Sequence, residues 1–343
     1  MKAFAALSNR LGIDMGSSQV RMYQKDKIIL AEASTVAVDN IDGHVLGFGT
    51  EALIHYHKAP ANNGLEWPVQ NGVIANYEMT KSMLRFFIKK SLHRSVSRPT
   101  VMIAIPGEIS SVTRHALVDA LIHAGSQHVY LIPAPAAAAI GAGLELDDPK
   151  VVLSLVIGRD VTDAGLYSCG GIVAQEEMSF GGHHIDLGIC QYLQDKYQIM
   201  IGLDQAERLK SEMISLSRNG GNTFTVRGRR IRDGVEVVIE LSTEEMSPVM
   251  QHIVQPVLQL IKRLLRNATP DMADDLLKQG MLVSGGSALL DGLKEWLSSE
   301  LGIPVTVPDA PADVVALGCY EAFEKYKSLP FLIENGEKYY GGA

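Results

Sequence analysis

The chain has 343 residues, a formal net charge of −8 and a sequence pI near 5.7. This acidic balance argues against a general nucleic-acid binder, whose affinity would depend on clustered lysine and arginine side chains. Hydrophobic residues make up 46% of the chain and charged residues 20%, which is typical of a globular protein large enough for two domains or one two-lobed body.

Three local features refine these exclusions. The basic stretch RGRRIR, over residues 227–232, is predicted to be a solvated hairpin tip. The cysteines are odd in number and lack metal-ligand spacing, which favours a reducing cytoplasm over a disulfide framework or a zinc site: Cys169, Cys190 and Cys319. No run of about 18 apolar residues predicts a membrane span, and the first ten residues are too weakly apolar for a signal peptide. We therefore expect a cytoplasmic protein.

The first part of the chain predicts strands and then strand–helix units. Five short strands bounded by glycine, aspartate or asparagine indicate a meander of mixed sheet: LGIDMG, QVRMYQ, KIILAEA, STVAV and HVLGFG. A helix follows, predicted from apolar residues at helical spacing: Met79, Met83, Phe86 and Phe87. The apolar run over 100–106 predicts a buried parallel strand, and a helix over 111–124 follows it. The strand HVYLI and the alanine-rich helix APAAAAIGAG repeat the step, which indicates an α/β organisation.

The second part repeats this order. Strands begin again at Val151 as VVLSLVI, TDAGLYS and GIVAQEEMSF, and helices are predicted over 183–197 and 203–216. A hairpin of FTVRGRR and VEVVIEL leads to a long amphipathic helix over 243–266. The chain then closes with strand GMLVSGG, a helix, strand PVTV and a last helix after Pro311. Two similar α/β lobes usually leave a ligand cleft between them, so an internal duplication predicts such a cleft.

Three turns have the composition of phosphate or nucleotide sites. The first, GIDMGSSQV, places Asp14 at a strand end and Gly16, Ser17 and Ser18 in the bend. Glycine permits close backbone approach to a ligand, and an acid beside it can hold Mg²⁺ through water. The second turn lies in LVIGRDVTDAGL, over 155–166, but carries arginine and aspartate where glycines would be expected. The third is LVSGGSALLDGL, where a strand enters a glycine pair and a helix start. Each is also compatible with an ordinary tight turn.

The order of these segments resembles the actin superfamily and, within it, the bacterial MreB family. The resemblance runs from about Leu11 to Phe323 and rests on LGIDMGSS, IAIPGEISSVTRHALVDALIHAG, IPAPAAAAIGAGL, LYSCGGIV, IGLDQAERLK, LVSGGSALLDGL and VVALGCYEA. It implies an actin-like duplicated two-lobed α/β fold with a nucleotide cleft between the lobes. The implied first lobe covers 1–145 plus 311–343, with a small insert at about 33–75. The implied second lobe covers 146–310, with an insert at about 183–242.

The resemblance also implies a site for ATP or ADP with Mg²⁺. Asp14 matches the acid that holds the metal through water. The implied nucleotide-binding residues come from both lobes: Gly16, Ser17, Ser18, Gly158, Thr162, Glu207, Lys210, Gly285, Gly286 and Ser287. Among these, Glu207 and Lys210 in AERLK match the residues that border the ribose and adenine. Gly285, Gly286 and Ser287 match the adenosine motif.

Two departures from the family pattern fall on positions of the hydrolytic chemistry. The family motif D-I-G-G-G-T-T-E is here VIGRDVTD, so Val156 replaces the acid and Arg159 and Asp160 replace two glycines. The family motif E-E-P is here Pro133-Ala134-Pro135, so Ala134 stands where the resemblance places the water-positioning acid. Hydrolysis in this class depends on an oriented water and on a metal that offsets developing charge. ATP hydrolysis is therefore expected to be weak or lost, unless Asp160 or Asp163 takes over the metal role; Arg159 could supply positive charge to phosphate or simply fill the pocket.

The implied function is cytoskeletal. The resemblance implies polymerisation into filaments at the inner face of the cytoplasmic membrane, determination of rod cell shape, and partners among other MreB-type proteins and the cell-wall synthesis machinery. Membrane contact is expected either from Phe4 and Leu7 or from Leu92, whose flanking cations could meet anionic lipid: Lys89, Lys90, His93 and Arg94. Frayed ends and a helix terminus with dipole-favoured cations explain the same residues.

Two alternatives from other classes stay open. One is a monomeric chaperone-like or regulatory nucleotide-binding module of the same fold. The other is a sugar or acetate kinase of the superfamily, which is disfavoured because no substrate-side acid or inserted substrate domain is apparent.

Overall fold

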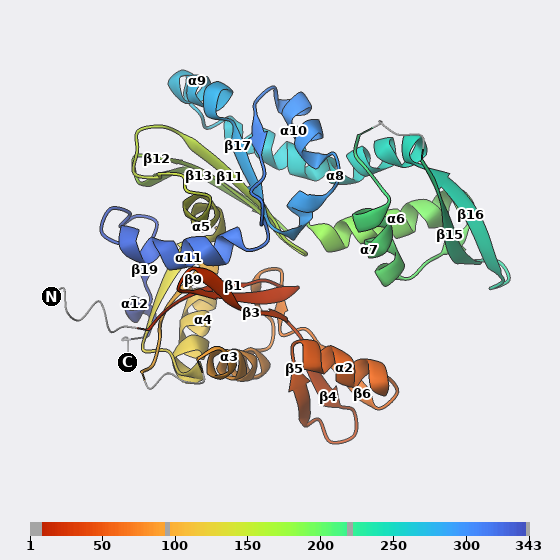
Figure 1. Ribbon diagram of the computed structural model, residues 1–343, viewed down its shortest axis with the longest axis horizontal. Helices are drawn as coiled ribbons and strands as arrows, with labels where there is room; N and C mark the ends of the chain where they lie inside the picture. The colour runs from red at the N-terminus through yellow and green to blue at the C-terminus, as the bar shows by residue number, and fades with distance from the viewer. Residues whose placement is uncertain (1–8, 93–96, 218–221, 341–343) are drawn as a thin grey trace.

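The protein is described by a computed structural model that covers residues 9–92, 97–217 and 222–340. Figure 1 shows two sheets stacked one above the other, with helices between them and a smaller insert projecting from each on the same side. The arrangement is the α/β, two-lobed organisation that the strand and helix pattern predicts.

The lower half in Figure 1 contains a six-stranded sheet. Its strand order is β19-β10-β9-β1-β2-β3, where β1 pairs antiparallel with β2 and parallel with β9. The strands are β1 Arg10–Met15, β2 Gln19–Gln24, β3 Lys27–Ala33, β9 Thr100–Ile105, β10 His128–Pro133 and β19 Glu334–Asn335. The central strands β1 and β9 are buried over most of their length, and β9 is almost wholly apolar, as expected for strands covered on both faces.

Helices cover both faces of this sheet. α3 (Tyr77–Ser91) and α4 (Ser111–Ala124) pack together on one face, and α11 (Val314–Lys325) lies on the other (Figure 1). Asn76 and Ser110 cap α3 and α4 by accepting backbone N–H groups from their first turns. Leu92, just after α3, is half-buried and packs against this core, so it does not stand free on the surface.

The upper half repeats the design with a five-stranded sheet of order β13-β12-β11-β17-β18. Its strands are β11 Val152–Ile157, β12 Thr162–Ser168, β13 Gly171–Met178, β17 Met281–Ser284 and β18 Val305–Thr306. As in the first sheet, the opening strand pairs antiparallel with the second and parallel with a later one. The predicted duplication is thereby confirmed. The helices α8 Thr243–Leu265, α9 Pro270–Gln279 and α10 Leu293–Leu301 complete this half.

The first insert corrects the prediction of one continuous five-strand meander. β4 (Val36–Asp39) and β5 (Val45–Phe48) leave the large sheet and pair in a separate one with β6 (Asn63–Glu66). Ser34 turns the chain there, since its hydroxyl donates to the Gly16 carbonyl and its N–H donates to Ser18 at 2.9 Å. Helix α2 Thr50–Lys58 and the short strands β7 Val69–Gln70 and β8 Val73–Ile74 belong to this region and were not predicted.

The second insert contains α6 (Gly182–Tyr197), α7 (Leu203–Glu212) and a three-stranded sheet of order β14-β15-β16. The predicted hairpin is confirmed as β15 (Thr223–Arg230) paired antiparallel with β16 (Glu236–Ser242); β14 covers Ile199–Met200. The basic stretch runs along β15 into the exposed hairpin turn, as predicted.

The two halves meet through α5 (Ala134–Gly141) and α11, which cross at glycines. A Cβ atom at Gly318 would lie 1.7 Å from the Ala137 carbonyl oxygen, so the helices touch backbone to backbone. The short helix α12 (Glu337–Tyr340) ends the described chain. Within the residues that the structure covers, every helix is too short or too polar to cross a membrane.

Candidate nucleotide site between the lobes

A cleft of about 950 Å³ lies between the two halves. Both strand hairpins, the start of α6, one face of α7 and the turn after β17 line it. From the predicted set these residues line it: Asp14, Gly16, Ser17, Ser18, Gly158, Glu207, Lys210, Gly285, Gly286 and Ser287. The ten predicted residues come from four separate parts of the chain and are brought together here, which matches the predicted cleft between duplicated lobes.

The two hairpins facing the cleft have the same turn. The Gly16 N–H donates to the Gln19 carbonyl at 3.1 Å, and the Gly158 N–H donates to the Val161 carbonyl at 2.8 Å. The strand register is also the same. Asp14, two residues before Gly16, lies opposite Arg21, and Val156, two residues before Gly158, lies opposite Asp163; each partner is seven positions later in the chain. The duplication therefore extends to the loops that could hold phosphate.

The first hairpin retains the features of a phosphate and metal site. Asp14 is half-buried, and this burial raises the pKa of its carboxyl to about 6, against the attraction of Arg21 and with added repulsion from Asp313. The Arg21 guanidinium donates to Asp313 at 2.8 Å, so part of its charge is already paired. Ser17 accepts the Gly72 N–H at 3.3 Å, while Ser18 is exposed at the cleft surface.

The second hairpin has a different charge pattern. Val156 offers no oxygen to a metal, and Asp160 is buried beside Arg159 with 4.0 Å between its Oδ1 and the guanidinium. Asp163, directly across from Val156, is buried; its Oδ2 accepts the Gly107 N–H at 3.0 Å, while its Oδ1 has no hydrogen-bond partner among the described residues. Burial, with repulsion from Glu177, raises the pKa of Asp163 well above its usual value. This hairpin therefore keeps an acid on the second strand, opposite the apolar Val156 on the first.

Thr162 is placed differently from the rest of the predicted set. Its side chain is fully buried, and its hydroxyl donates to the Phe180 carbonyl at 2.8 Å. Thr162 is not among the residues that line the cleft. The hydroxyl therefore stabilises the strand end and we leave Thr162 out of the site.

The turn after β17 closes the far side. Gly285 has φ +86° and donates its N–H to the Pro311 carbonyl at 2.8 Å. A Cβ atom there would lie 2.4 Å from the Ile157 carbonyl oxygen. Gly286 is exposed, and the Ser287 hydroxyl donates to the Gly158 carbonyl at 3.0 Å, which links this turn to the second hairpin. The predicted helix start is a short 3₁₀ helix, η1 Gly286–Leu289, rather than an α-helix.

Glu207 and Lys210 lie one turn apart on α7 and both line the cleft, as their spacing predicts. Glu207 is exposed. The Lys210 ammonium lies 2.8 Å from Asp186 Oδ1 and donates to the Gly182 carbonyl at 3.0 Å. Burial raises the pKa of Asp186 while Lys210 lowers it. Lys210 thus holds α7 against the start of α6.

The positions where the resemblance places hydrolytic acids also line the cleft. Ala134 is the first residue of α5, and Val156 is the second-last residue of β11. Neither side chain has an oxygen that could bind water or a metal. The sequence did not predict several further residues that line the cleft, among them Tyr56, Trp67, His183 and Asp186. Tyr56 lies on α2 and Trp67 in the β6–β7 connection. The sequence patterns predicted no secondary structure for this part of the chain.

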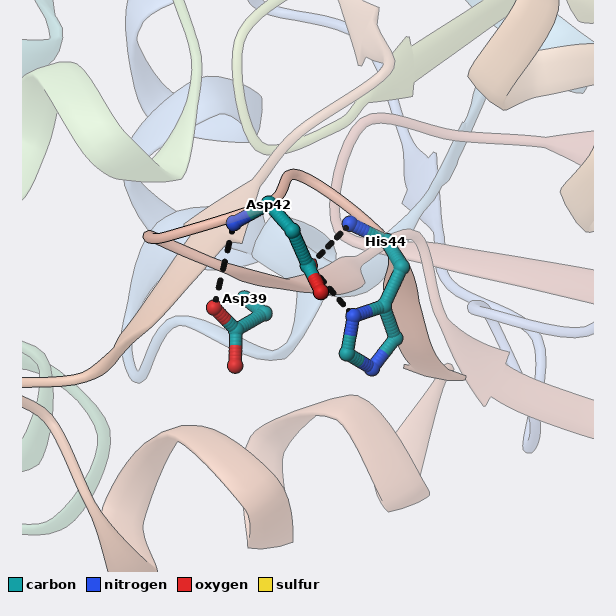
Figure 2. Close-up of side chains that lie close together, drawn as sticks. All are labelled: Asp39, Asp42 and His44. Atoms are coloured by element: carbon teal, nitrogen blue, oxygen red, sulfur yellow. Dashed lines mark hydrogen bonds and ion pairs between the residues drawn. The ribbon is translucent and has the colours of Figure 1, made fainter.

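Among the described residues, one group of potential metal ligands lies outside the cleft. Asp39, Asp42 and His44 gather in the exposed turn between β4 and β5 (Figure 2). Their contacts are those of the turn itself: Asp39 accepts the Ile41 N–H at 2.7 Å, and Asp42 accepts the His44 N–H at 3.0 Å. These bonds explain the cluster as a hairpin turn.

Two duplicated α/β lobes with matching glycine hairpins on a common cleft define an actin-like protein. A sequence profile described as MreB/Mbl protein matches residues 8–330, and this chain belongs to the MreB/Mbl family. It is 33% identical over 323 residues to the cell shape-determining protein Mbl of Bacillus subtilis, covering 93% of this chain and 97% of that protein. It is 33% identical over 333 residues to the cell shape-determining protein MreB of Escherichia coli, covering 94% and 96%.

Solved structures agree on the fold. The crystal structure of MreB 5 of Spiroplasma citri bound to AMPPNP has a TM-score of 0.86 and 25% identity, covering 94% of this chain and 97% of that chain. The MamK double helical filament has a TM-score of 0.76 at 16% identity, covering 92% of this chain and 98% of that chain, and shows the shared fold alone. The expected actin-like fold is confirmed.

Proposed function

We propose that this chain is an MreB-type cytoskeletal protein that binds adenine nucleotide in the interlobe cleft, assembles into membrane-associated filaments and determines cell shape. The cleft is the observation that carries the proposal, because ten residues predicted from the family pattern converge on it. The domain division follows the same logic: 1–145 plus 311–343 with an insert at about 33–75, and 146–310 with an insert at about 183–242.

The first hairpin, with Asp14, fits a nucleotide with Mg²⁺ better than the second hairpin, with Val156 and Arg159. Asp14 would hold the metal through water, and the first hairpin offers Gly16, Ser17 and Ser18 to the phosphates. The exposed backbone at Gly286 would meet the base or ribose. MreB 5 of Spiroplasma citri, at 25% identity, was solved with AMPPNP and with ADP, which supports adenine nucleotide as the ligand.

Hydrolysis is proposed to be weak or lost. Bound Mg²⁺ supplies charge neutralisation to the phosphates, but turnover also needs an oriented water. Ala134 and Val156 cannot orient water or bind the metal. Asp163 is engaged with the Gly107 N–H, and its pKa is raised, so the carboxyl has a stronger tendency to stay protonated than an exposed aspartate. The nucleotide would then act as a ligand that stabilises one lobe arrangement.

Assembly and membrane contact complete the proposal. MamK, whose structure is a double helical filament, shares the fold, and the cell-shape relatives share the family. The proposed membrane residues Phe4, Leu7, His93 and Arg94 lie outside the described residues. Asn9 borders the first of these segments, and its carbonyl accepts the N–H of Thr100, a few residues after the second, at 2.8 Å. Both segments therefore join the body near the starts of the central strands β1 and β9, which supports a single membrane-facing end of the first lobe and a peripheral location at the inner membrane face.

Sedimentation of the full chain, checked by electron microscopy, tests assembly without nucleotide and with Mg-ATP. We expect pelletable filaments, and inclusion of anionic vesicles is expected to bring them to the membrane. A folded chain that remains monomeric under every condition would contradict the cytoskeletal function and favour a regulatory nucleotide-binding module.

A further inference from the structure

We propose that Arg159 and Trp67 form a latch that holds the two lobes together across the cleft with the protein's own side chains. The Arg159 guanidinium carbon lies 4.3 Å from the centroid of the Trp67 ring. A cation within about 6 Å of the face of a tryptophan ring is attracted by the negative face of its π-system. Arg159 belongs to the β11–β12 turn of one lobe, and Trp67 to the β6–β7 connection of the other.

The arginine end of the latch is fixed to its own lobe. The Arg159 carbonyl accepts the His183 N–H at 2.8 Å, and the Gly158 carbonyl accepts the Gly182 N–H at 2.9 Å. Both donors begin α6. The Ser287 hydroxyl also donates to Gly158, so the tip of the hairpin is bonded to two neighbouring elements. A pull on the Arg159 side chain is therefore transmitted to the body of the second lobe.

The tryptophan end is fixed in the same way. The carbonyl of the next residue, Pro68, accepts the Ala75 N–H at 2.9 Å and the Thr80 hydroxyl at 3.1 Å. Val69 is fully buried in the core of the first lobe. Trp67 therefore stands on a segment with fixed ends, and its contact with Arg159 constrains the lobes rather than a free loop.

The charges around the contact leave the guanidinium available to the ring. The Arg159 side chain is 31% exposed. The Asp160 carboxylate lies 4.0 Å from the guanidinium, which is beyond hydrogen-bonding distance. His183, on the same side, has its pKa lowered by burial first and then by Arg159, so it adds little competing charge. A planar guanidinium stacks on an aromatic face better than an ammonium, so lysine should replace Arg159 only in part.

The latch also gives a role to the altered second hairpin. In the family pattern glycine stands at this position, where the backbone approaches phosphate; here a side chain reaches across the cleft instead. A phosphate anion in the cleft would compete with Trp67 for the same guanidinium. This competition rests on the proposed nucleotide binding, whereas the latch itself does not.

Spin labels on the two inserts test the latch without nucleotide. Ile41 and Val238 are 89% and 59% exposed and lie on the β4–β5 turn and on β16, which project on the same side of the molecule (Figure 1). Each would be replaced by cysteine in a chain carrying Cys169→Ser and Cys190→Ala, and distances measured by double electron–electron resonance. Removing one cation–π contact shifts an open-to-closed ratio by about 2- to 5-fold.

We expect Arg159→Gly and Trp67→Ala each to increase the long-distance population by that factor, and the double variant to increase it no further. Trp67→Phe keeps a ring and should fall between wild type and Trp67→Ala; it also serves if Trp67→Ala does not fold. Arg232→Gly removes an arginine that is 82% exposed and should leave the distances unchanged. Unchanged distances in both single variants, or effects that multiply in the double variant, would overturn the latch.

A nucleotide titration separates this inference from the proposed function. Mg-ATP binding by wild type and Arg159→Gly, measured by calorimetry, reports the site independently of the distances. If the distances respond to the variants while neither protein binds Mg-ATP, the latch stands and the nucleotide function fails. If both proteins bind Mg-ATP with unchanged distances, the latch is wrong and the nucleotide function stands.

Discussion

Val156 and Asp163 lie directly opposite each other on β11 and β12, at the register that Asp14 and Arg21 occupy in the first lobe. The two hairpins thus present their acids from different strands. The first lobe has an acid on the opening strand with a cation opposite, and the second has an apolar residue with an acid opposite. The family motif D-I-G-G-G-T-T-E has an acid at both of these positions, so this hairpin lacks the first acid, at Val156, and keeps the second, as Asp163.

Restoring an acid at position 156 is expected to destabilise the chain. Val156→Asp would place two carboxylates directly across a strand pair in a partly buried position, which costs about 1–3 kcal/mol in the free energy of unfolding. Adding Asp163→Asn removes the repulsion and should recover part of this loss. Urea denaturation of the single and double variants measures it; an equal loss in both would show that the two side chains do not interact.

The glycine pair after β17 offers a matched test of backbone strain. Gly285→Ala must keep φ near +86° and would place Cβ 2.4 Å from a carbonyl oxygen, so we expect a loss of about 1–3 kcal/mol in unfolding free energy. Gly286→Ala meets open space and should change stability by less than about 0.5 kcal/mol. Thermal and urea unfolding would compare them. Similar stability for both variants would contradict the geometry at Gly285.

The helix crossing at the base of the lobes is expected to be intolerant of any side chain. Gly318→Ala would force Cβ to 1.7 Å from the Ala137 carbonyl oxygen, so α5 and α11 must separate, at a cost of about 3 kcal/mol or more. Gly202→Ala, at an exposed site with open space, is the control; because Gly202 caps α7 and alanine caps less well, we expect a loss of no more than about 1 kcal/mol. Equal melting temperatures for the two variants would refute the close crossing.

The stability of the chain is expected to depend on pH through Asp14. Its carboxyl pKa is raised by burial from 3.8 to about 6, so the folded state binds more protons than the unfolded state between these values. Protonated Asp14 contributes at most about 3 kcal/mol to the free energy of unfolding. This contribution is fully present below pH 4 and is lost as the pH rises through about 6. Asp14→Asn lacks this loss, so its stability relative to wild type should rise from pH 4 to pH 7. A pH-independent difference would show that Asp14 titrates normally.

Much of this architecture could be predicted because its strands and helices have strong patterns. The buried runs of β1, β9 and β11 and the 3.6-residue period of α8 identify the duplicated lobes, and the glycine turns identify the cleft. The insert around Trp67 could not be predicted in the same way. Strands β6, β7 and β8 have four residues or fewer and carry little periodicity, so the latch partner of Arg159 emerged only from the tertiary fold. Thr162 shows a different limit, since the alignment placed it at the site while its side chain is buried at the start of β12, a strand that is buried over nearly its whole length.

Binding of ATP in the cleft without effective turnover, as proposed above, is tested most directly in a single-turnover experiment. Radiolabelled Mg-ATP would be mixed with excess full-length protein, and the bound nucleotide recovered over time, with Escherichia coli MreB in parallel. We predict that labelled ATP is retained and converted to ADP much more slowly than by that relative. Conversion at the rate of the relative, or no retention of ATP, would contradict the account.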